Sequence, residues 1–291
     1  MTIWNLGSIN ADHFYYLSHL PKPGETLLAI SHTTGLGGKG ANMSVAAARA
    51  GAHVRHIGAV GPDGGWAVER LTEYGVDTRT IGQVNVATAT AIISVDQAGE
   101  NSIIIDPGAN HLISEQQVSH ALSGANANDI FVTQNETNAQ VDAARIAADA
   151  NLTVAYAAAP FSAQAVEEIL PLLSFLILNE VEAGQLTEAT GKSPQDLGIE
   201  TVIVTKGGAG ADLYRDGQNT KSFAAIKVEP VDTTGAGDTF TGYVLAGMDR
   251  GLTIDQSISL AMRAGALMVM RQGTADVIPD LKEVENFSLD Q

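Results

Sequence analysis

The sequence has no cysteine among its 291 residues. Disulfide bonds and thiolate metal sites are therefore excluded, and a reducing compartment fits this composition. No apolar run approaches the ~20 residues that a transmembrane helix needs. The first residues, MTIWNLGSIN, contain no basic segment followed by an apolar one, so we do not expect a signal peptide. These absences favour a cytoplasmic protein without a membrane partner.

Basic residues are also scarce, because 16 Lys and Arg stand against 33 Asp and Glu, for a net charge of −17. Such an acidic surface repels nucleic acids and anionic lipids, so neither is expected as a partner. An anionic substrate would have to be held locally, by backbone amides, a few cations or a bound metal. The hydrophobic content of 45% is normal for a packed core and argues against disorder.

Strand-like and helix-like segments alternate along most of the chain. Apolar runs such as 54–61, 129–136, 174–180 and 201–208 are separated by helical patterns. This alternation predicts an α/β fold with a mostly parallel sheet flanked by helices on both faces. Residues 86–106 differ, because two strand-like runs meet there at a tight turn and predict an antiparallel pair. No linker or repeat divides the chain, so we expect one domain over residues 1–291.

Polar side chains directly follow the apolar runs in several places. In open sheets of this class, ligands bind at the carboxyl ends of the strands. The groups concerned are Asn10 with Asp12, Asn135 with Glu136, Asn179 with Glu182, Thr205 to Gly208, and Asp232 to Asp238. Their recurrence predicts a functional site at that edge of the sheet.

Two familiar fingerprints fit the sequence poorly. GLGGKG at 35–40 matches the dinucleotide pattern, but it follows the polar run AISHTT, and the next predicted strand ends in glycine rather than an acid. TEATGKS at 187–193 ends like a P-loop, but Leu186 occupies the position of the required first glycine, and the segment follows a helix. An NAD(P)-dependent oxidoreductase that uses the first motif stays open as an alternative function.

The stretch VDTTGAGDTF at 231–240 combines the elements of an anion site. Gly235, Ala236 and Gly237 lead into an apolar helix, so their backbone amides can approach an anion at the helix N-terminus. Asp238 lies in the first turn and has two interpretations. It is either a cap of the helix or a base that accepts the proton of an attacking hydroxyl.

Other groups supply what phosphoryl transfer to a hydroxyl would further need. Asn10 and Asp12 can grip neighbouring hydroxyls of a polyol, and Asn179 and Glu182 share one helix face from which they can reach a hydrated Mg²⁺. GGKGAN offers backbone, Lys39 and Asn42, and Glu136 can take a sugar hydroxyl. VTKGGAG suits nucleotide contact. Helix caps, surface side chains and a simple turn remain the plain alternatives for these groups.

Taken in order, these motifs resemble those of the ribokinase family of carbohydrate kinases. The resemblance covers essentially the whole chain and rests on GSINADH, GGKGAN before an alanine-rich helix, GAN at 108–110, NEVEA, TKGGAG and DTTGAGDTF. It implies ATP and Mg²⁺ as cofactors and a primary sugar hydroxyl as the acceptor. It also implies that segments 12–36 and 86–106 form a β lid, which in such families often pairs the subunits of a homodimer.

The resemblance also assigns roles to residues. Asp238 would be the base, with Gly235, Ala236 and Gly237 lining the anion hole, and Glu182 would act on the metal through water. The sugar would be held by Asn10, Asp12, Gly38, Lys39, Gly40, Asn42 and Glu136. ATP would be contacted by Asn179, Thr205, Gly207, Gly210 and Gly237.

A K⁺ site is a further implication, and here the sequence departs from the family. The matching positions are Asp232, Thr234, Met268, Arg271, Gly273 and Val277. Val277 replaces a serine hydroxyl that relatives usually offer, which weakens the case for a K⁺ requirement. VAYAAAP also lacks the asparagine common before the family's proline-containing strand exit.

Ribose is the first expectation for the sugar, since GSINADH and GGKGAN look most like ribokinase. Fructose or another ketose, deoxyribose and nucleosides remain alternatives within the family. A non-catalytic sugar-binding protein on the same fold is the alternative of another class.

Overall fold

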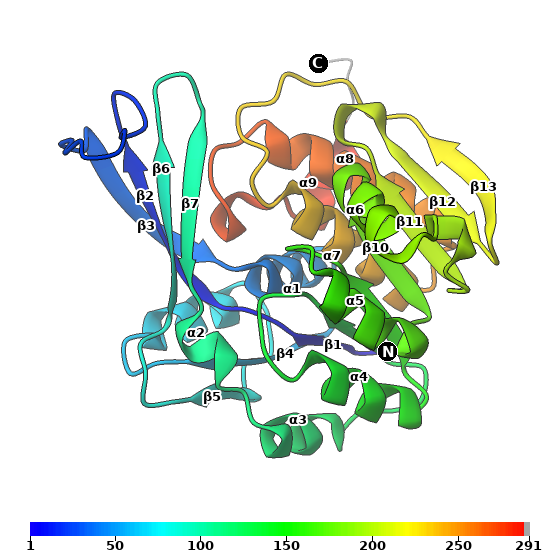
Figure 1. Cartoon of the computed structure of the whole chain (residues 1–291). Helices are drawn as coiled ribbons and strands as arrows, with labels where there is room; N and C mark the ends of the chain where they lie inside the picture. The colour runs from blue at the N-terminus through cyan, green and yellow to red at the C-terminus, as the bar shows by residue number, and fades with distance from the viewer. Residues whose placement is uncertain (288–291) are drawn as a thin grey trace.

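A mixed sheet forms the centre of the molecule (Figure 1). The computed structural model describes residues 1–287, and within them this sheet has nine strands in the order β13-β12-β11-β10-β9-β8-β1-β4-β5. The strands are β1 (Ile3–Leu6), β4 (Val54–Val60), β5 (Ile81–Gln83), β8 (Ile130–Thr133), β9 (Thr153–Ala157), β10 (Phe175–Asn179), β11 (Thr201–Thr205), β12 (Ala211–Arg215) and β13 (Gln218–Phe223). β12 pairs antiparallel with both of its neighbours, β11 and β13, and the other pairs are parallel.

Helices cover both faces of this sheet, as the alternation in the sequence predicts. The helices are α1 (Lys39–Arg49), α2 (Gly65–Glu73), α3 (Glu115–Leu122), α4 (Gln140–Asp149), α5 (Ala163–Ile169), α6 (Glu180–Thr190), α7 (Ala236–Asp249), α8 (Ile254–Val269) and α9 (Leu281–Asn286). One core cluster joins the sheet to α1, α2, α7, α8 and α9, and a second joins it to α3, α4, α5 and α6. None of the described helices is long and apolar enough to cross a bilayer.

The strands supply both clusters because neighbouring side chains point to opposite faces of a sheet. In β10, Ile177 belongs to the first cluster, whereas Leu176 and Leu178 belong to the second. A strand buried on both faces has to be apolar throughout, which explains the run FLIL in this segment.

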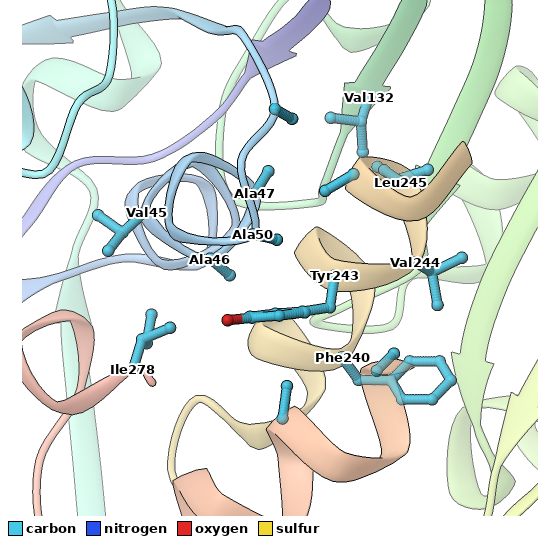
Figure 2. Close-up of a cluster of buried hydrophobic side chains, with 14 of the residues drawn as sticks. Val45, Ala46, Ala47, Ala50, Val132, Phe240, Tyr243, Val244, Leu245 and Ile278 are labelled. Carbon is cyan, nitrogen blue, oxygen red and sulfur yellow. The ribbon is translucent and has the colours of Figure 1, made fainter. Parts of the chain in front are cut away.

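The first cluster brings α1 and α7 into close contact (Figure 2). Ala46 and Ala47 of α1 face Tyr243 of α7, whose hydroxyl donates a hydrogen bond to the carbonyl of Pro279 over 2.8 Å. A Cβ atom on Gly242 would lie 2.5 Å from the Cβ of Ala46. Small side chains therefore let the two helices approach, and this approach fixes the relative position of their N-termini.

A second, four-stranded sheet projects from the main body (Figure 1). It has the order β3-β2-β6-β7 and consists of β2 (Asn10–Tyr16), β3 (Ser31–Gly37), β6 (Ala89–Val95) and β7 (Asn101–Asp106). β6 and β7 pair antiparallel, as the sequence predicts, while β2 and β6 pair parallel. These strands overlap the segments 12–36 and 86–106 that the resemblance assigns to a lid.

Candidate active site

The N-terminus of α7 opens into a cavity of about 320 Å³. Gly235 is the N-cap residue, with a φ of 73°, and no side chain caps this helix end. Backbone amides at a helix N-terminus attract anions, because they carry partial positive charge. Here the Ala236 amide also donates a long hydrogen bond of 3.3 Å to the Thr233 carbonyl. The cavity is lined on this side by Thr233, Thr234, Gly235, Gly237 and Asp238.

Asp238 is buried and does not cap the helix. Its Oδ2 accepts a hydrogen bond of 2.9 Å from Nδ2 of Asn42, on α1. Burial raises the pKa of Asp238, and the charge of Lys39 and the Asn42 hydrogen bond counter this effect. Of the two interpretations left open by the sequence, the cap is not what the structure shows. The carboxylate instead lies at the cavity wall beside one cation.

Lys39 is the first residue of α1 and also lines the cavity. Its pKa is raised, chiefly by the negative charge of Asp238 and further by Glu136 and Glu182. The ammonium group therefore stays charged at neutral pH, close to the point where an anion would meet the α7 amides.

A second buried carboxylate, Asp12 of β2, lies close enough to interact with Glu136 and Asp238. Burial first, and then the charges of those two residues, raise the pKa of Asp12 to about 7, while Lys39 lowers it. The Asp12 side chain is removed from water, and within residues 1–287 it receives no hydrogen bond in compensation. Such a group is ready to bond to a ligand hydroxyl.

Glu136 and Asn10 are held in place by a polar network. Glu136 Oε2 accepts hydrogen bonds from Ser8 Oγ at 2.6 Å and from the Lys39 amide at 3.1 Å. Asn10 Oδ1 accepts one of 2.8 Å from Nδ2 of Asn110, whose own Oδ1 accepts from the Ile9 amide. Ser8 and Asn110 are positioning residues that the sequence argument did not select. Both stand inside quoted motifs, GSINADH and GAN, and that was the available signal.

The backbone of GGKGAN comes very close to the end of β1. A Cβ atom on Gly40 would lie 2.4 Å from Cα of Gly7, so both positions need glycine. Asn42 follows on the first turn of α1, and its Oδ1 is buried without a hydrogen-bond partner in the described structure. Gly38 and Gly40 thus bring backbone against Ser8 and Gly7, and Asn42 places one free acceptor atom near Asp238.

Asn179 and Glu182 also line the cavity, and they form a capping box. Asn179 Oδ1 accepts from the Glu182 amide, and Glu182 Oε2 accepts from the Asn179 amide, both at 2.8 Å. Burial raises the pKa of Glu182. The cap named as the plain alternative is therefore present, and it holds the Glu182 carboxylate at the cavity.

The glycine-rich exit of β11 is only partly at the cavity. Thr205 lines it, whereas Gly207 and Gly210 do not. Gly207 lies in a short 3₁₀ turn (Gly207–Ala209), and Gly210 follows that turn before β12. Their contact with a nucleotide stays a prediction.

The segments matched to a K⁺ site meet behind the start of α7. Asp232 Oδ1 accepts from the Thr234 amide at 2.9 Å, and its Oδ2 accepts from the Gly273 amide at 3.1 Å. The guanidinium of Arg271 donates to the Val277 carbonyl and pairs with Glu283 at 2.7 Å. The structure thus joins residues 232–234 to 271–277, and K⁺ binding itself stays a prediction.

The donor set suits a hydrated Mg²⁺ better than a protein-built metal cage. Within residues 1–287, no three His, Asp or Glu side chains gather as metal ligands. Mg²⁺ keeps several waters and commonly uses one or two carboxylates together with substrate phosphates. Glu182, which lines the same cavity as the start of α7, fits that role.

Comparisons with known proteins agree with this geometry. Residues 3–281 match the pfkB family carbohydrate kinases. A ribokinase of Haemophilus influenzae is 35% identical over 301 residues, covering 98% of each chain. The solved structure of a Thermotoga maritima ribokinase is 32% identical with a TM-score of 0.88, covering 98% of each chain. An Arabidopsis thaliana ribokinase complexed with ribose and ATP is 29% identical with a TM-score of 0.83, covering 99% of each chain.

Fold and relatives together define a phosphotransferase with an alcohol group as acceptor. The chain belongs to the pfkB family of carbohydrate kinases, and its fold is that of ribokinases. The resemblance inferred from the motifs is thereby confirmed. The oxidoreductase alternative is excluded, because GLGGKG runs from an exposed strand of the small sheet into α1 and follows no strand of the central sheet.

Proposed function

We propose that this protein is an ATP-dependent ribokinase, which transfers the γ-phosphoryl group of ATP to the primary hydroxyl of ribose. The observation that carries the proposal is the position of Asp238. This buried carboxylate stands at the N-terminus of α7, between an anion-binding set of amides and the sugar-side carboxylates Asp12 and Glu136. The ribokinases among the relatives support ribose as the sugar.

Asp238 serves as the base. It orients the attacking hydroxyl and accepts its proton while the new bond to phosphorus forms and the bond between the γ-phosphorus and the bridging oxygen breaks. The electron pair of that second bond leaves with ADP. Asn42 holds the carboxylate through its 2.9 Å hydrogen bond, so that one oxygen remains directed to the substrate.

The backbone amides of Gly235, Ala236 and Gly237 form the anion hole for the transferred phosphoryl group. Charge on its oxygens grows during transfer, and preorganised amides stabilise it without a further cation. Lys39 adds one positive charge at the same place. An acidic protein can bind a polyphosphate in this way.

The sugar lies against Asp12, Asn10 and Glu136, with the GGKGAN backbone and Asn42 beside it. Asp12 has no internal partner to lose, and Asn42 Oδ1 is a free acceptor. Two acceptors at this wall favour a ligand with adjacent hydroxyls, which is the chemistry of a pentose.

ATP lies between Thr205, Asn179 and the start of α7, with Gly207 and Gly210 at the exit of β11. Glu182 would hold Mg²⁺ through water, and the bound ion would neutralise charge on the phosphates. The cation site at Asp232, Thr234, Arg271 and Gly273 would bind K⁺ behind the anion hole, where its charge would strengthen the amide field.

The small sheet acts as a lid that excludes water, because water at this site would turn the enzyme into an ATPase. Its face away from the cavity exposes Ile92 and Ile104, which supports a homodimer formed through the lid. We place the enzyme in the cytoplasm, consistent with its lack of cysteine.

A coupled ADP-release assay tests the proposal. The panel contains ribose, deoxyribose, fructose and nucleosides, each with and without K⁺. We expect the highest kcat/KM with ribose. A higher value for another sugar would replace ribose, and sugar binding without ADP release would show a non-catalytic sugar-binding protein.

The variant Asp12→Ala tests the placement of the sugar. It should raise the KM for ribose and leave the KM for ATP unchanged, because Asp12 lies at the sugar wall. A rise in the KM for ATP alone would show that the sugar has been placed on the wrong side of Asp238.

A further inference from the structure

A network of hydrogen-bonded polar side chains crosses the interior next to the sugar half of the proposed site. It consists of Asn5 of β1, Ser44 of α1, His56 of β4 and Gln134, which follows β8, and none of the four is more than 1% exposed. Polar groups buried this deeply are costly unless they are bonded, and among these four side chains Gln134 Oε1 alone lacks a partner within residues 1–287. The proposed mechanism uses none of them.

The donor and acceptor of each hydrogen bond in this network can be assigned. The Gly7 carbonyl can only accept, so Nε2 of His56, 3.0 Å away, must carry the proton. Nδ1 is then an acceptor and takes the Ser44 hydroxyl over 2.8 Å. Asn5 donates from Nδ2 to Ser44 Oγ at 2.8 Å, and its Oδ1 accepts from Gln134 at 2.8 Å.

This network also bonds to two backbone carbonyls of the proposed sugar site. Asn5 Nδ2 also donates to the Gly40 carbonyl over 2.8 Å, and His56 donates to the Gly7 carbonyl. The backbones of these two glycines cross closely, since a Cβ atom on either one would lie 2.4 Å from Cα of the other. Ser8 and Lys39, their neighbours, both donate to Glu136. A displacement of the crossing would therefore move Glu136 and the GGKG backbone together.

We propose that His56 is a positioning residue for sugar binding, which acts as a fixed neutral Nε2–H tautomer through Ser44 and Asn5 on the Gly7–Gly40 crossing. The proposal deepens the proposed function and rests on it, because it concerns the sugar half of that site. Burial lowers the pKa of His56 to about 4, partly offset by the Gly7 hydrogen bond, so the ring stays neutral at physiological pH. The hydrogen bonds of the network are therefore kept at physiological pH.

Kinetics of Ser44→Ala provide the first test. Loss of the hydroxyl breaks the link between Asn5 and His56, and we expect the KM for the sugar to rise about fivefold to tenfold. The kcat and the KM for ATP should stay within about twofold, since the α7 amides and the nucleotide wall are not touched. Ser257→Ala is the matched control, because this serine is equally buried in a helix and bonds only to the Thr253 carbonyl. It should leave all three constants unchanged.

An unchanged sugar KM in Ser44→Ala would overturn the proposal, and so would an equal rise in Ser257→Ala. The assay uses whichever sugar the wild-type enzyme phosphorylates best. Wild-type protein that phosphorylates no sugar would refute the proposed function instead, so the two failures are distinct.

A second measurement does not depend on any variant. In ¹⁵N-edited NMR of the wild-type protein, the His56 ring should show a neutral Nε2–H tautomer that does not titrate between pH 5 and 8. Addition of the sugar should shift the Nε2 resonance more than addition of ATP does. Titration of the ring within that range, a proton on Nδ1, or a larger response to ATP would each contradict the proposal.

Discussion

The two most informative carboxylates for a stability test are Asp12 and Asp129. They are almost equally buried, at 5% and 4% exposed, but their pKa values are shifted in opposite directions. Burial and neighbouring carboxylates raise the pKa of Asp12 to about 7. Burial also acts on Asp129, but hydrogen bonds from Asn126, Trp4 and Thr2 outweigh it and lower the pKa of that residue.

These shifts fix the sign of each residue's effect on folding. The folded protein holds the Asp12 proton more tightly than the unfolded chain, so its stability falls as the pH rises from about 4 to 7. The difference between about 7 and the ordinary value of 3.8 corresponds to about 4 kcal/mol at pH 8. Asp129 stabilises the protein when charged, and this contribution is lost as the pH falls through its folded pKa.

The substitution Asp12→Asn removes the free-energy cost of holding a charged carboxylate at this buried position. In urea unfolding without sugar, the variant should be more stable than wild type by about 4 kcal/mol at pH 8, and this gain should vanish near pH 4. Asp129→Asn, the matched control, should instead be less stable than wild type at pH 8. If Asp12→Asn gains nothing at pH 8, or gains equally at both pH values, the reasoning about this cluster is refuted.

Three further predictions concern the base, the metal and the packing of the helices. Asp238→Asn should lower kcat by roughly 10²–10⁴-fold with little loss of folding, and near-normal turnover in the ADP-release assay would remove Asp238 from the mechanism. Glu182→Gln keeps the capping hydrogen bond to Asn179 but loses the negative charge. The variant should therefore need more Mg²⁺ for half-maximal rate, with an unchanged KM for the sugar. An unaltered Mg²⁺ dependence would contradict the assignment of Glu182 to the metal. Gly242→Ala should lower the free energy of unfolding by about 1–3 kcal/mol in thermal or urea unfolding, because its Cβ would meet Ala46. The control Gly265→Ala, with open space around it in α8, should raise the free energy of unfolding by up to ~1 kcal/mol. Equal effects of the two substitutions would show that contact between the helices is not the cause.

Most of the fold could be predicted, because strands buried on both faces and amphipathic helices have different periods. β5 was missed, since Ile81–Gln83 is too short to produce a pattern. The parallel pairing of β2 with β6 was missed for another reason. Residues 10–16 and 89–95 are far apart in sequence, and only the three-dimensional structure pairs them.

The site could be predicted as a set of strand ends but not as a set of contacts. Asp12 and Asp238 were selected because each carboxylate follows an apolar run, yet their interaction depends on the folded sheet. The pairs Asn10–Asn110 and Ser8–Glu136 join residues 100 and 128 positions apart. His56 gave no sequence signal at all, since a histidine inside a strand resembles any core residue until its partners are known.

The chain passes from the central sheet to the small sheet, the proposed lid, in three residues, Gly7 to Ile9, between the end of β1 and the start of β2. Asn10 and Asp12 therefore belong to the small sheet, whereas Lys39, Asn42 and Asp238 belong to helices of the main body. A rotation at this joint would pull the two halves of the sugar site apart. If the small sheet is a lid, a sugar that bonds to both halves would favour its closed position, and the affinity for sugar would depend on the free energy of closure.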